Sequence, residues 1–143
     1  MNKLLIYCVT NERVKYLEDT KLVLAGVGKK KFSKNYTTCL RGKNIQNKER
    51  NYSELTFHYW FWKNQLQYHH VDDWIGFCQK RRFWLNSKRD NERDDISKRI
   101  LKSIPNEWEN YDAVLCEPIK LGTKLSKLIK RGWKNVIKKP KRF

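Results

Sequence analysis

The chain has 143 residues, of which 39% are hydrophobic and 13% aromatic, and its formal net charge is +17. This composition excludes an intrinsically disordered polymer, and the length fits one domain with a sizeable core. No apolar run is long enough to span a membrane, and the four cysteines lie too far apart for a structural zinc site, so we expect reduced, buried thiols in a cytoplasmic protein.

The high positive charge has two interpretations. It favours a polyanionic partner or an anionic surface, because a strong net field attracts opposite charge. It is equally explained by a lysine-rich composition, since the lysines are spread along the whole chain and not gathered on one motif. Composition alone leaves both interpretations open.

Two strands are predicted in the N-terminal part. The apolar run from Lys3 to Thr10 predicts a buried first strand, and Lys21 to Gly28 predicts a second. The two glycines that end this second run do not complete a dinucleotide-binding GxGxxG motif, because Lys31 stands where the third glycine would fall. A loop rich in lysine and asparagine is predicted from Lys29 to Arg50.

An aromatic helix is predicted from Tyr52 to Leu66. Ser53 is placed to cap its first turn, and Glu54 puts a negative charge at the positive end of the helix dipole. The aromatic run from Tyr59 to Trp62 is expected to be core rather than a platform for stacking bases. The apolar stripe is expected to contain Leu55, Tyr59, Trp62 and Leu66, which recur at helical spacing, with Phe57 and Phe61 widening it, so that the helix is largely buried.

The short apolar run from Trp74 to Cys78 predicts a central strand covered on both faces. It leads into Arg81 and Arg82. In an open α/β sheet, ligands bind at the carboxyl ends of the strands, so two guanidiniums there favour an anion, and a phosphate above all, over a solvated charge run. Asp72 and Asp73 precede the strand and are expected to form a polar turn.

Further elements follow along the chain. Asp94 and Asp95 are placed to cap a helix that ends at Pro105, and Tyr111 to Cys116 predicts another strand. That helix is expected to carry Ile96, Ile100, Leu101 and Ile104 on one face. Strands that alternate with helices predict an α/β fold with a mixed, mostly parallel sheet flanked by helices.

The last part of the chain is predicted to be a basic amphipathic helix. Residues 1–119 are expected to form the α/β domain, and residues 120–143 a tail with an apolar stripe and lysines on the opposite face. This tail either touches an anionic membrane surface or packs against the sheet with a solvated outer face.

Five segments of the chain carry a resemblance to a known family. They are Leu5–Thr10, Gly42–Ile45, Tyr52–Thr56, Tyr59–Asn64 and Trp74–Trp84. In this order they resemble a bacterial capsular and exopolysaccharide glycosyltransferase-like family, domain of unknown function 4422, in which some members resemble galactofuranosyltransferases. The resemblance implies a GT-A-like sheet, a nucleotide-diphosphate-sugar site, and a chain that is a truncated N-terminal part, with its sheet incomplete at the C-terminus.

Site residues follow from this resemblance. Glu54 is the candidate catalytic residue, with a purely structural role at the helix dipole as the alternative. This chain departs from the family's pattern at three places. Lys43 replaces an Asp, Asn11 stands where the family often has a His, and Gln79-Lys80 replace a His-Tyr pair. No Asp-x-Asp element follows a strand, so no metal and no cofactor are expected. The implied donor-binding residues are Val9, Thr10, Gly42, Asn44, Ile45, Tyr52, Glu54, Tyr59, Lys63, Arg81 and Arg82.

The resemblance therefore implies a glycosyltransferase for capsular or surface polysaccharide synthesis. It would transfer a hexosyl or galactofuranosyl group from a uridine-diphosphate sugar to a saccharide or lipid-linked acceptor, in the cytoplasm or at the inner face of the membrane. Two alternatives remain: a non-catalytic truncated fragment that binds a partner, and a basic nucleic-acid-binding protein. The second is disfavoured because no recognised nucleic-acid motif occurs.

Overall fold

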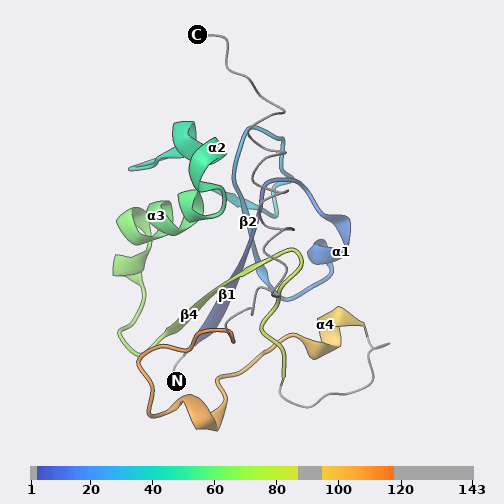
Figure 1. Ribbon diagram of the computed structural model, residues 1–143, viewed down its shortest axis with the longest axis vertical. Helices are drawn as coiled ribbons and strands as arrows, with labels where there is room; N and C mark the ends of the chain where they lie inside the picture. The colour runs from blue at the N-terminus through green and yellow to red at the C-terminus, as the bar shows by residue number, and fades with distance from the viewer. Residues whose placement is uncertain (1–2, 87–94, 118–143) are drawn as a thin grey trace, which may run out of the picture. The chain divides into compact units, whose positions relative to one another are not determined.

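The structure of the chain is a computed structural model that describes residues 3–86 and 95–117 (Figure 1). Contacts divide the chain into two units, Met1–Glu109 and Asn110–Phe143. Every helix and strand that the structure describes belongs to the first unit. The predicted basic tail at residues 120–143 lies outside the described residues.

The first unit is built on a four-stranded sheet in the order β3-β2-β1-β4. Its strands are β1 (Leu4–Thr10), β2 (Val23–Gly26), β3 (Thr37–Thr38) and β4 (Trp74–Gln79). All neighbouring strands are parallel. The prediction of an α/β fold with a parallel sheet flanked by helices is confirmed, as are the first two strands.

The prediction that Trp74 to Cys78 forms the central strand is wrong. The inner strands are β1 and β2, and β4 pairs only with β1 among the described strands, so it lies at an edge of the described sheet. The run is apolar on both faces because helices and loops cover both faces of the sheet here. Burial of the faces does not require a neighbouring strand on each edge.

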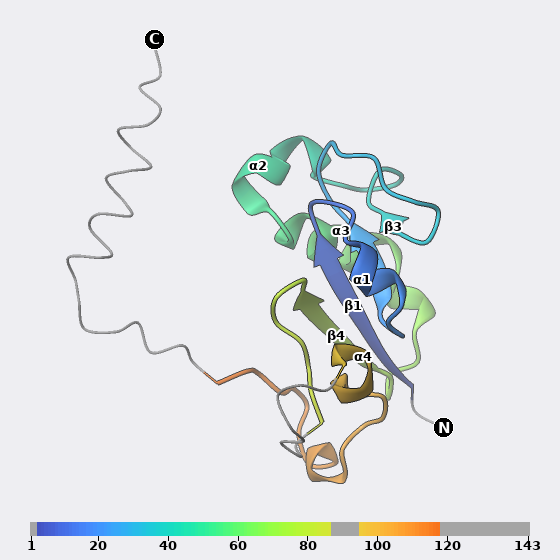
Figure 2. The same ribbon diagram turned by 90° about the vertical axis from the view of Figure 1, so that its right-hand side faces the viewer.

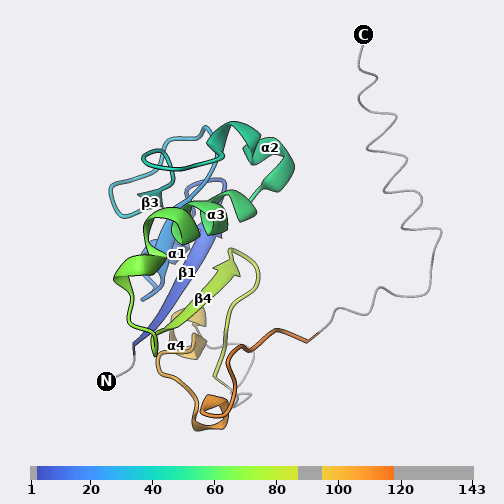
Figure 3. The same ribbon diagram turned by 90° about the vertical axis from the view of Figure 1, so that its left-hand side faces the viewer.

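Side chains of the strands alternate between two cores, one on each face of the sheet. In β1, Ile6 and Cys8 belong to the first core, and Val9 and Tyr7 belong to the second. The first core also takes in Leu17 of α1 (Lys15–Glu18) and the segment just after α4 (Ile96–Arg99). The second core is formed with α3 (Leu55–Asn64). Figures 2 and 3 show α1 and α3 on opposite faces of the sheet.

The single helix predicted from Tyr52 to Leu66 is divided in two. Helix α2 (Glu49–Tyr52) ends at Ser53, which has a φ of 48°, and α3 begins after Glu54. A positive φ is rare for a residue with a side chain, and it turns the chain sharply between the helices. The predicted cap at Ser53 is therefore wrong, and Glu54 takes the cap position of α3 without a capping hydrogen bond from its side chain.

The predicted apolar stripe of this helix is confirmed only in part, because Phe57 and Phe61 are buried but most of the residues at helical spacing face away from the core. Leu55, Trp62 and Leu66 are 57%, 58% and 45% exposed. Nearly every residue from 55 to 62 is apolar or aromatic, so the pattern could not select one face. The buried side of α3 consists of Thr56, Phe57, Trp60 and Phe61. The aromatic run is thus core only at Trp60 and Phe61.

The second half of the described chain is less regular than predicted. Asp95 caps α4 by accepting a hydrogen bond from the amide of Ser97 (3.1 Å), but the helix ends at Arg99 because Ile100 is extended. The amide of Leu101 donates instead to the carbonyl of Trp84 (2.9 Å). The predicted strand from Tyr111 to Cys116 is absent, and Leu115 is 87% exposed.

Three short 3₁₀ turns complete the elements: η1 (Gln46–Lys48), η2 (Leu66–Tyr68) and η3 (Asn106–Trp108). The first lies in the connection between β3 and α2, and the second connects α3 to the loop that precedes β4. The described helices include none that combines the length and apolarity needed to cross a membrane.

Candidate functional site

The carboxyl ends of β1 and β4 meet at the point where the strand order reverses. The chain passes from β1 to β2 and β3 on one side, then crosses over so that β4 pairs with the other side of β1. In open parallel sheets, the loops on the two sides of such a point diverge and leave room for a ligand. The segments that follow β1 and β4 therefore form the candidate site.

Glu12 connects the segments that follow three of the strands. Its carboxylate contacts Lys80 after β4 through Oε1, and its Oε2 lies 2.9 Å from Nζ of Lys30 after β2. Hydrogen bonds from Lys80 and then Lys30, with the attraction of their charges, lower the pKa of Glu12 from 4.5 to about 2. Glu12 therefore carries its negative charge at neutral and mildly acidic pH, and it holds two lysines at this edge.

Lys80 stands in a tight turn that also carries the predicted arginine pair. Gln79 and Arg82 exchange backbone hydrogen bonds of 3.1 and 3.0 Å across the turn, and the hydroxyl of Tyr16 donates to the carbonyl of Lys80. Arg81 and Arg82 are exposed, and neither forms an ion pair within residues 3–86 and 95–117. The turn thus presents two guanidiniums to solvent at the carboxyl end of β4, and the binding of an anion there stays a prediction.

Val9 and Thr10, two of the implied donor-binding residues, are each only 1% exposed. Val9 packs in the second core. The Thr10 hydroxyl donates to the carbonyl of Glu12, and its own carbonyl accepts a 2.9 Å hydrogen bond from the amide of Val27. Both residues therefore support the backbone that carries Glu12, and a role for them in donor binding stays a prediction.

Gly42 and Asn64 join two of the segments that resemble the family. Asn64, at the end of α3, accepts from the amide of Lys43 (3.0 Å) and donates to its carbonyl (2.8 Å). Gly42 has a φ of 74°, and a Cβ atom there would overlap with the side chain of Asn64. Trp60 adds a 2.6 Å hydrogen bond from its indole nitrogen to the carbonyl of Arg41. We call this set of contacts the Gly42–Asn64 clamp.

The next implied residues, Asn44 and Ile45, continue the same loop. Asn44 donates to the carbonyl of Gly42 (2.9 Å) and accepts from the amide of Gln46 (3.2 Å). Gln46 in turn donates to the carbonyl of Gly28 (2.7 Å), two residues after the end of β2. These side chains therefore shape the loop and connect it to the sheet, while Ile45 is half-buried.

Glu54, the candidate catalytic residue, lies at the start of α3 one turn before His58. The His58 ring lies 4.1 Å from the ring of Phe77 in β4, and its burial lowers its pKa, an effect that Glu54 partly opposes. Glu54 is half-buried, whereas Tyr52, at the end of α2, is 47% exposed. The structure thus places Glu54 at the start of α3, close enough to act on His58, which itself contacts β4.

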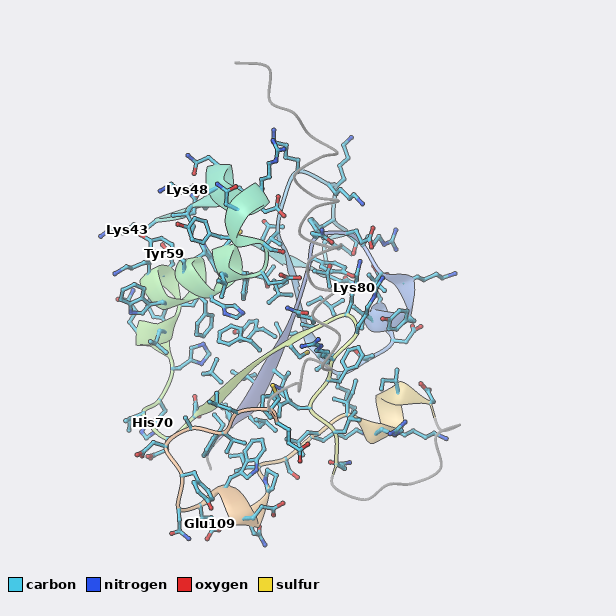
Figure 4. All side chains as sticks on the ribbon, in the orientation of Figure 1. Lys43, Lys48, Tyr59, His70, Lys80 and Glu109 are labelled. Atoms are coloured by element: carbon cyan, nitrogen blue, oxygen red, sulfur yellow. The ribbon has the colours of Figure 1, made fainter. Side chains whose placement is uncertain are left out.

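Tyr59 and Lys63 belong to the outer face of α3. The ammonium of Lys63 lies 3.3 Å from the centroid of the Trp62 ring, and Tyr59 meets the same ring edge-on at 6.1 Å. Figure 4 shows Tyr59, Lys43 and Lys48 on the side of α2 and α3, and Lys80 on the side of α1. Stacking between a cation and an indole stabilises the exposed ring.

The implied donor-binding residues therefore fall into two groups. Val9, Thr10, Arg81 and Arg82 lie at the carboxyl ends of β1 and β4, and the others belong to α2, α3 and the loop before them. Across the described ranges, no hydrogen bond or ion pair joins the groups directly. The sequence patterns did not indicate that Glu12, Lys30 and Lys80 form one cluster. The feature that could have indicated it is Glu12 itself, an acidic residue two positions after the first strand.

Cys8, Cys39 and Cys78 are buried, Cys116 is exposed, and all four are free thiols. The expectation of buried, reduced cysteines therefore fits the first three and is wrong for Cys116. In the portion that the structure describes, no group of three or more His, Cys, Asp or Glu side chains could hold a metal ion.

Comparison with known proteins assigns a family without an activity. The family model described as Domain of unknown function (DUF4422) matches residues 5–138. This range takes in β1, the Gly42–Asn64 clamp, α3 and the cationic turn after β4. Neither a curated protein nor a solved structure matches the chain.

Proposed function

We propose that this chain, which belongs to the family described as Domain of unknown function (DUF4422), is a glycosyltransferase-like protein that binds a nucleotide-diphosphate sugar. The observation that carries the proposal is the cationic edge where the strand order reverses. Lys80, Arg81 and Arg82 follow β4 there, and Glu12 holds Lys30 beside them.

This arrangement suits the chemistry of glycosyl transfer. When the bond between the sugar and the diphosphate breaks, negative charge builds on the oxygens of the leaving group. Cations that are already fixed in position stabilise that charge without reorganisation in the transition state. Tyr16 and the turn from Gln79 to Arg82 hold the backbone that carries Lys80 and Arg81. The proposed mechanism therefore uses side-chain cations at the diphosphate.

Glu54 is the proposed catalytic carboxylate. It belongs to α3, which packs on the face of the sheet that carries Phe77 of β4, two residues before the turn begins. A carboxylate at this place could accept a proton from an acceptor hydroxyl, which is general-base catalysis. The proposed acceptor is a saccharide or lipid-linked saccharide of capsular or surface polysaccharide synthesis.

The first expected result concerns the donor. Uridine diphosphate, free or attached to a sugar, should bind the protein, and Arg81→Ala should weaken binding by about 1.5–3 kcal/mol, the scale for hydrogen bonds to charged groups. Isothermal titration calorimetry measures both affinities. Lys98→Ala is the matched control, because it also removes an exposed cation but from α4, on a different segment.

Three outcomes would contradict this proposal. Single-stranded RNA or duplex DNA could bind while uridine diphosphate does not bind up to millimolar concentration, which would favour the nucleic-acid alternative. Equal affinity of Arg81→Ala and wild type would show that the phosphates bind elsewhere. A loss of affinity in Lys98→Ala as large as in Arg81→Ala would indicate attraction by net charge alone, without a defined site.

The acceptor suggests where the protein works. We propose a cytoplasmic protein whose basic tail, residues 120–143, touches the anionic inner face of a membrane, where a lipid-linked acceptor would lie. Each lysine or arginine near such a surface contributes about 1 kcal/mol. Phosphatidylglycerol vesicles should therefore float the protein at low salt, and less of it as salt rises.

A truncation lacking Leu121 to Phe143 tests whether the tail is responsible. It should lose flotation and keep the circular dichroism spectrum of a folded α/β protein. Neutral phosphatidylcholine vesicles are the control for non-specific attachment. If the intact protein ignores anionic vesicles, or if the truncation unfolds, the tail packs against the domain instead and the membrane proposal is wrong.

A further inference from the structure

Glu12 is the negative group at the centre of the cationic edge. It lies between two ammonium groups that come from separate parts of the chain, Lys30 after β2 and Lys80 after β4. Two other carboxylates come near these segments: Glu18 pairs with Arg13 at 2.7 Å, and Glu49 lies against Gly28 and forms no ion pair within the described ranges. Glu12 thus pairs with two cations at once at the position where parallel sheets bind their ligands.

We infer that the Glu12 carboxylate occupies the position of a phosphate group of the ligand, and that an incoming phosphate displaces it from Lys30 and Lys80. This inference rests on the proposed function and adds two phosphate-binding residues and an internal competitor to it. Displacement is an exchange of ionic partners, and no covalent bond forms or breaks.

Exposure of the three side chains permits this exchange. The side chains of Glu12, Lys30 and Lys80 are 40%, 64% and 27% exposed. Exposed ion pairs contribute little to stability, because water and salt screen the charges. Glu12 itself belongs to no helix or strand. Its side chain can therefore move away from the two lysines without unfolding any of these elements.

Charge favours the phosphate over the carboxylate. A terminal phosphate carries up to two negative charges and three acceptor oxygens, whereas Glu12 offers one charge and two oxygens. Hydrogen bonds between ionised groups are stronger than neutral ones, and more of them form around a phosphate. Arg81 and Arg82, on the same turn as Lys80, add further cations that Glu12 does not neutralise. The exchange therefore runs toward the phosphate.

The inference leads to an expected gain of affinity. In Glu12→Gln the competitor loses its charge but keeps its size, so uridine diphosphate and inorganic pyrophosphate should bind about three- to tenfold more tightly than to wild type. This range corresponds to the loss of two exposed ion pairs that binding must otherwise break. Calorimetry on the full chain measures both ligands, and Glu107→Gln, which removes an exposed acid from η3, is the matched control.

A second variant keeps the test decisive if Glu12→Gln folds poorly. Lys30→Met removes a cation after β2 and should weaken pyrophosphate binding severalfold. If wild type binds uridine diphosphate and Glu12→Gln binds it no more tightly, or if Lys30→Met has no effect, the inference is wrong while the proposed function stands. If neither ligand binds wild type or any variant, the proposed function fails as well.

Discussion

Phe57→Ala is expected to lower the free energy of unfolding by about 3–5 kcal/mol, the usual cost of removing a buried aromatic ring. Phe57 is 0% exposed, and its ring lies between 5.4 and 6.5 Å from the rings of Tyr7, Trp60, Phe61 and Phe77. Truncation would leave a cavity between α3 and the sheet. Urea unfolding followed by circular dichroism measures the change.

Leu55→Ala is the matched control, because it shortens an apolar side chain on the same helix. Leu55 is 57% exposed, so the change should stay within about 0.5 kcal/mol. The comparison decides which face of α3 meets the sheet. If Leu55→Ala were the more destabilising variant, the stripe of Leu55, Tyr59, Trp62 and Leu66 would be the buried one, and the packing of α3 described above would be wrong.

Gly42→Ala is expected to cost about 2–3 kcal/mol of stability. About 1–2 kcal/mol comes from the left-handed backbone at a φ of 74°, which disfavours a residue with a Cβ atom. About 1 kcal/mol more comes from weakened hydrogen bonds, since the new methyl group displaces the Asn64 side chain. The same unfolding experiment measures this loss.

Two further single variants and one double variant test the contribution of the Gly42–Asn64 clamp to stability. Lys43→Ala should change stability by no more than about 0.5 kcal/mol, because Lys43 is exposed and only its backbone groups bind Asn64. Asn64→Ala should be destabilising, and the double variant with Gly42→Ala should cost less than the sum of the single changes, because both break the same contacts. Full additivity would show that the two residues do not act together.

The clamp gives a physical reason for two segments that resemble the family. The loop at Gly42 and the end of α3 at Asn64 lie far apart in sequence, yet the paired hydrogen bonds of Asn64 make each depend on the other. Gly42 and Asn44 are implied as donor-binding residues. Their structural roles in this loop already require a glycine and an asparagine at these positions. A role in donor binding would be additional to these contacts.

The sequence by itself determined the fold class and the first strands. Short apolar runs alternating with polar segments predict strands whatever surrounds them, so β1 and β2 were located correctly. Asp95 at the start of α4 was also predicted, because a cap depends on residues two or three positions away. The position of Arg81 and Arg82 after β4 was also predicted, because it depends only on the strand that directly precedes them in the sequence.

Only the tertiary structure decided which face of α3 is buried, where β4 lies in the sheet and which charges meet. A helix that is apolar all round has no preferred face until a sheet is packed against it, and Phe57 rather than Leu55 meets Tyr7. Glu12 and Lys80 stand 68 positions apart and come together because two parallel strands end at one edge. Contacts of this kind depend on topology, which local sequence patterns do not encode.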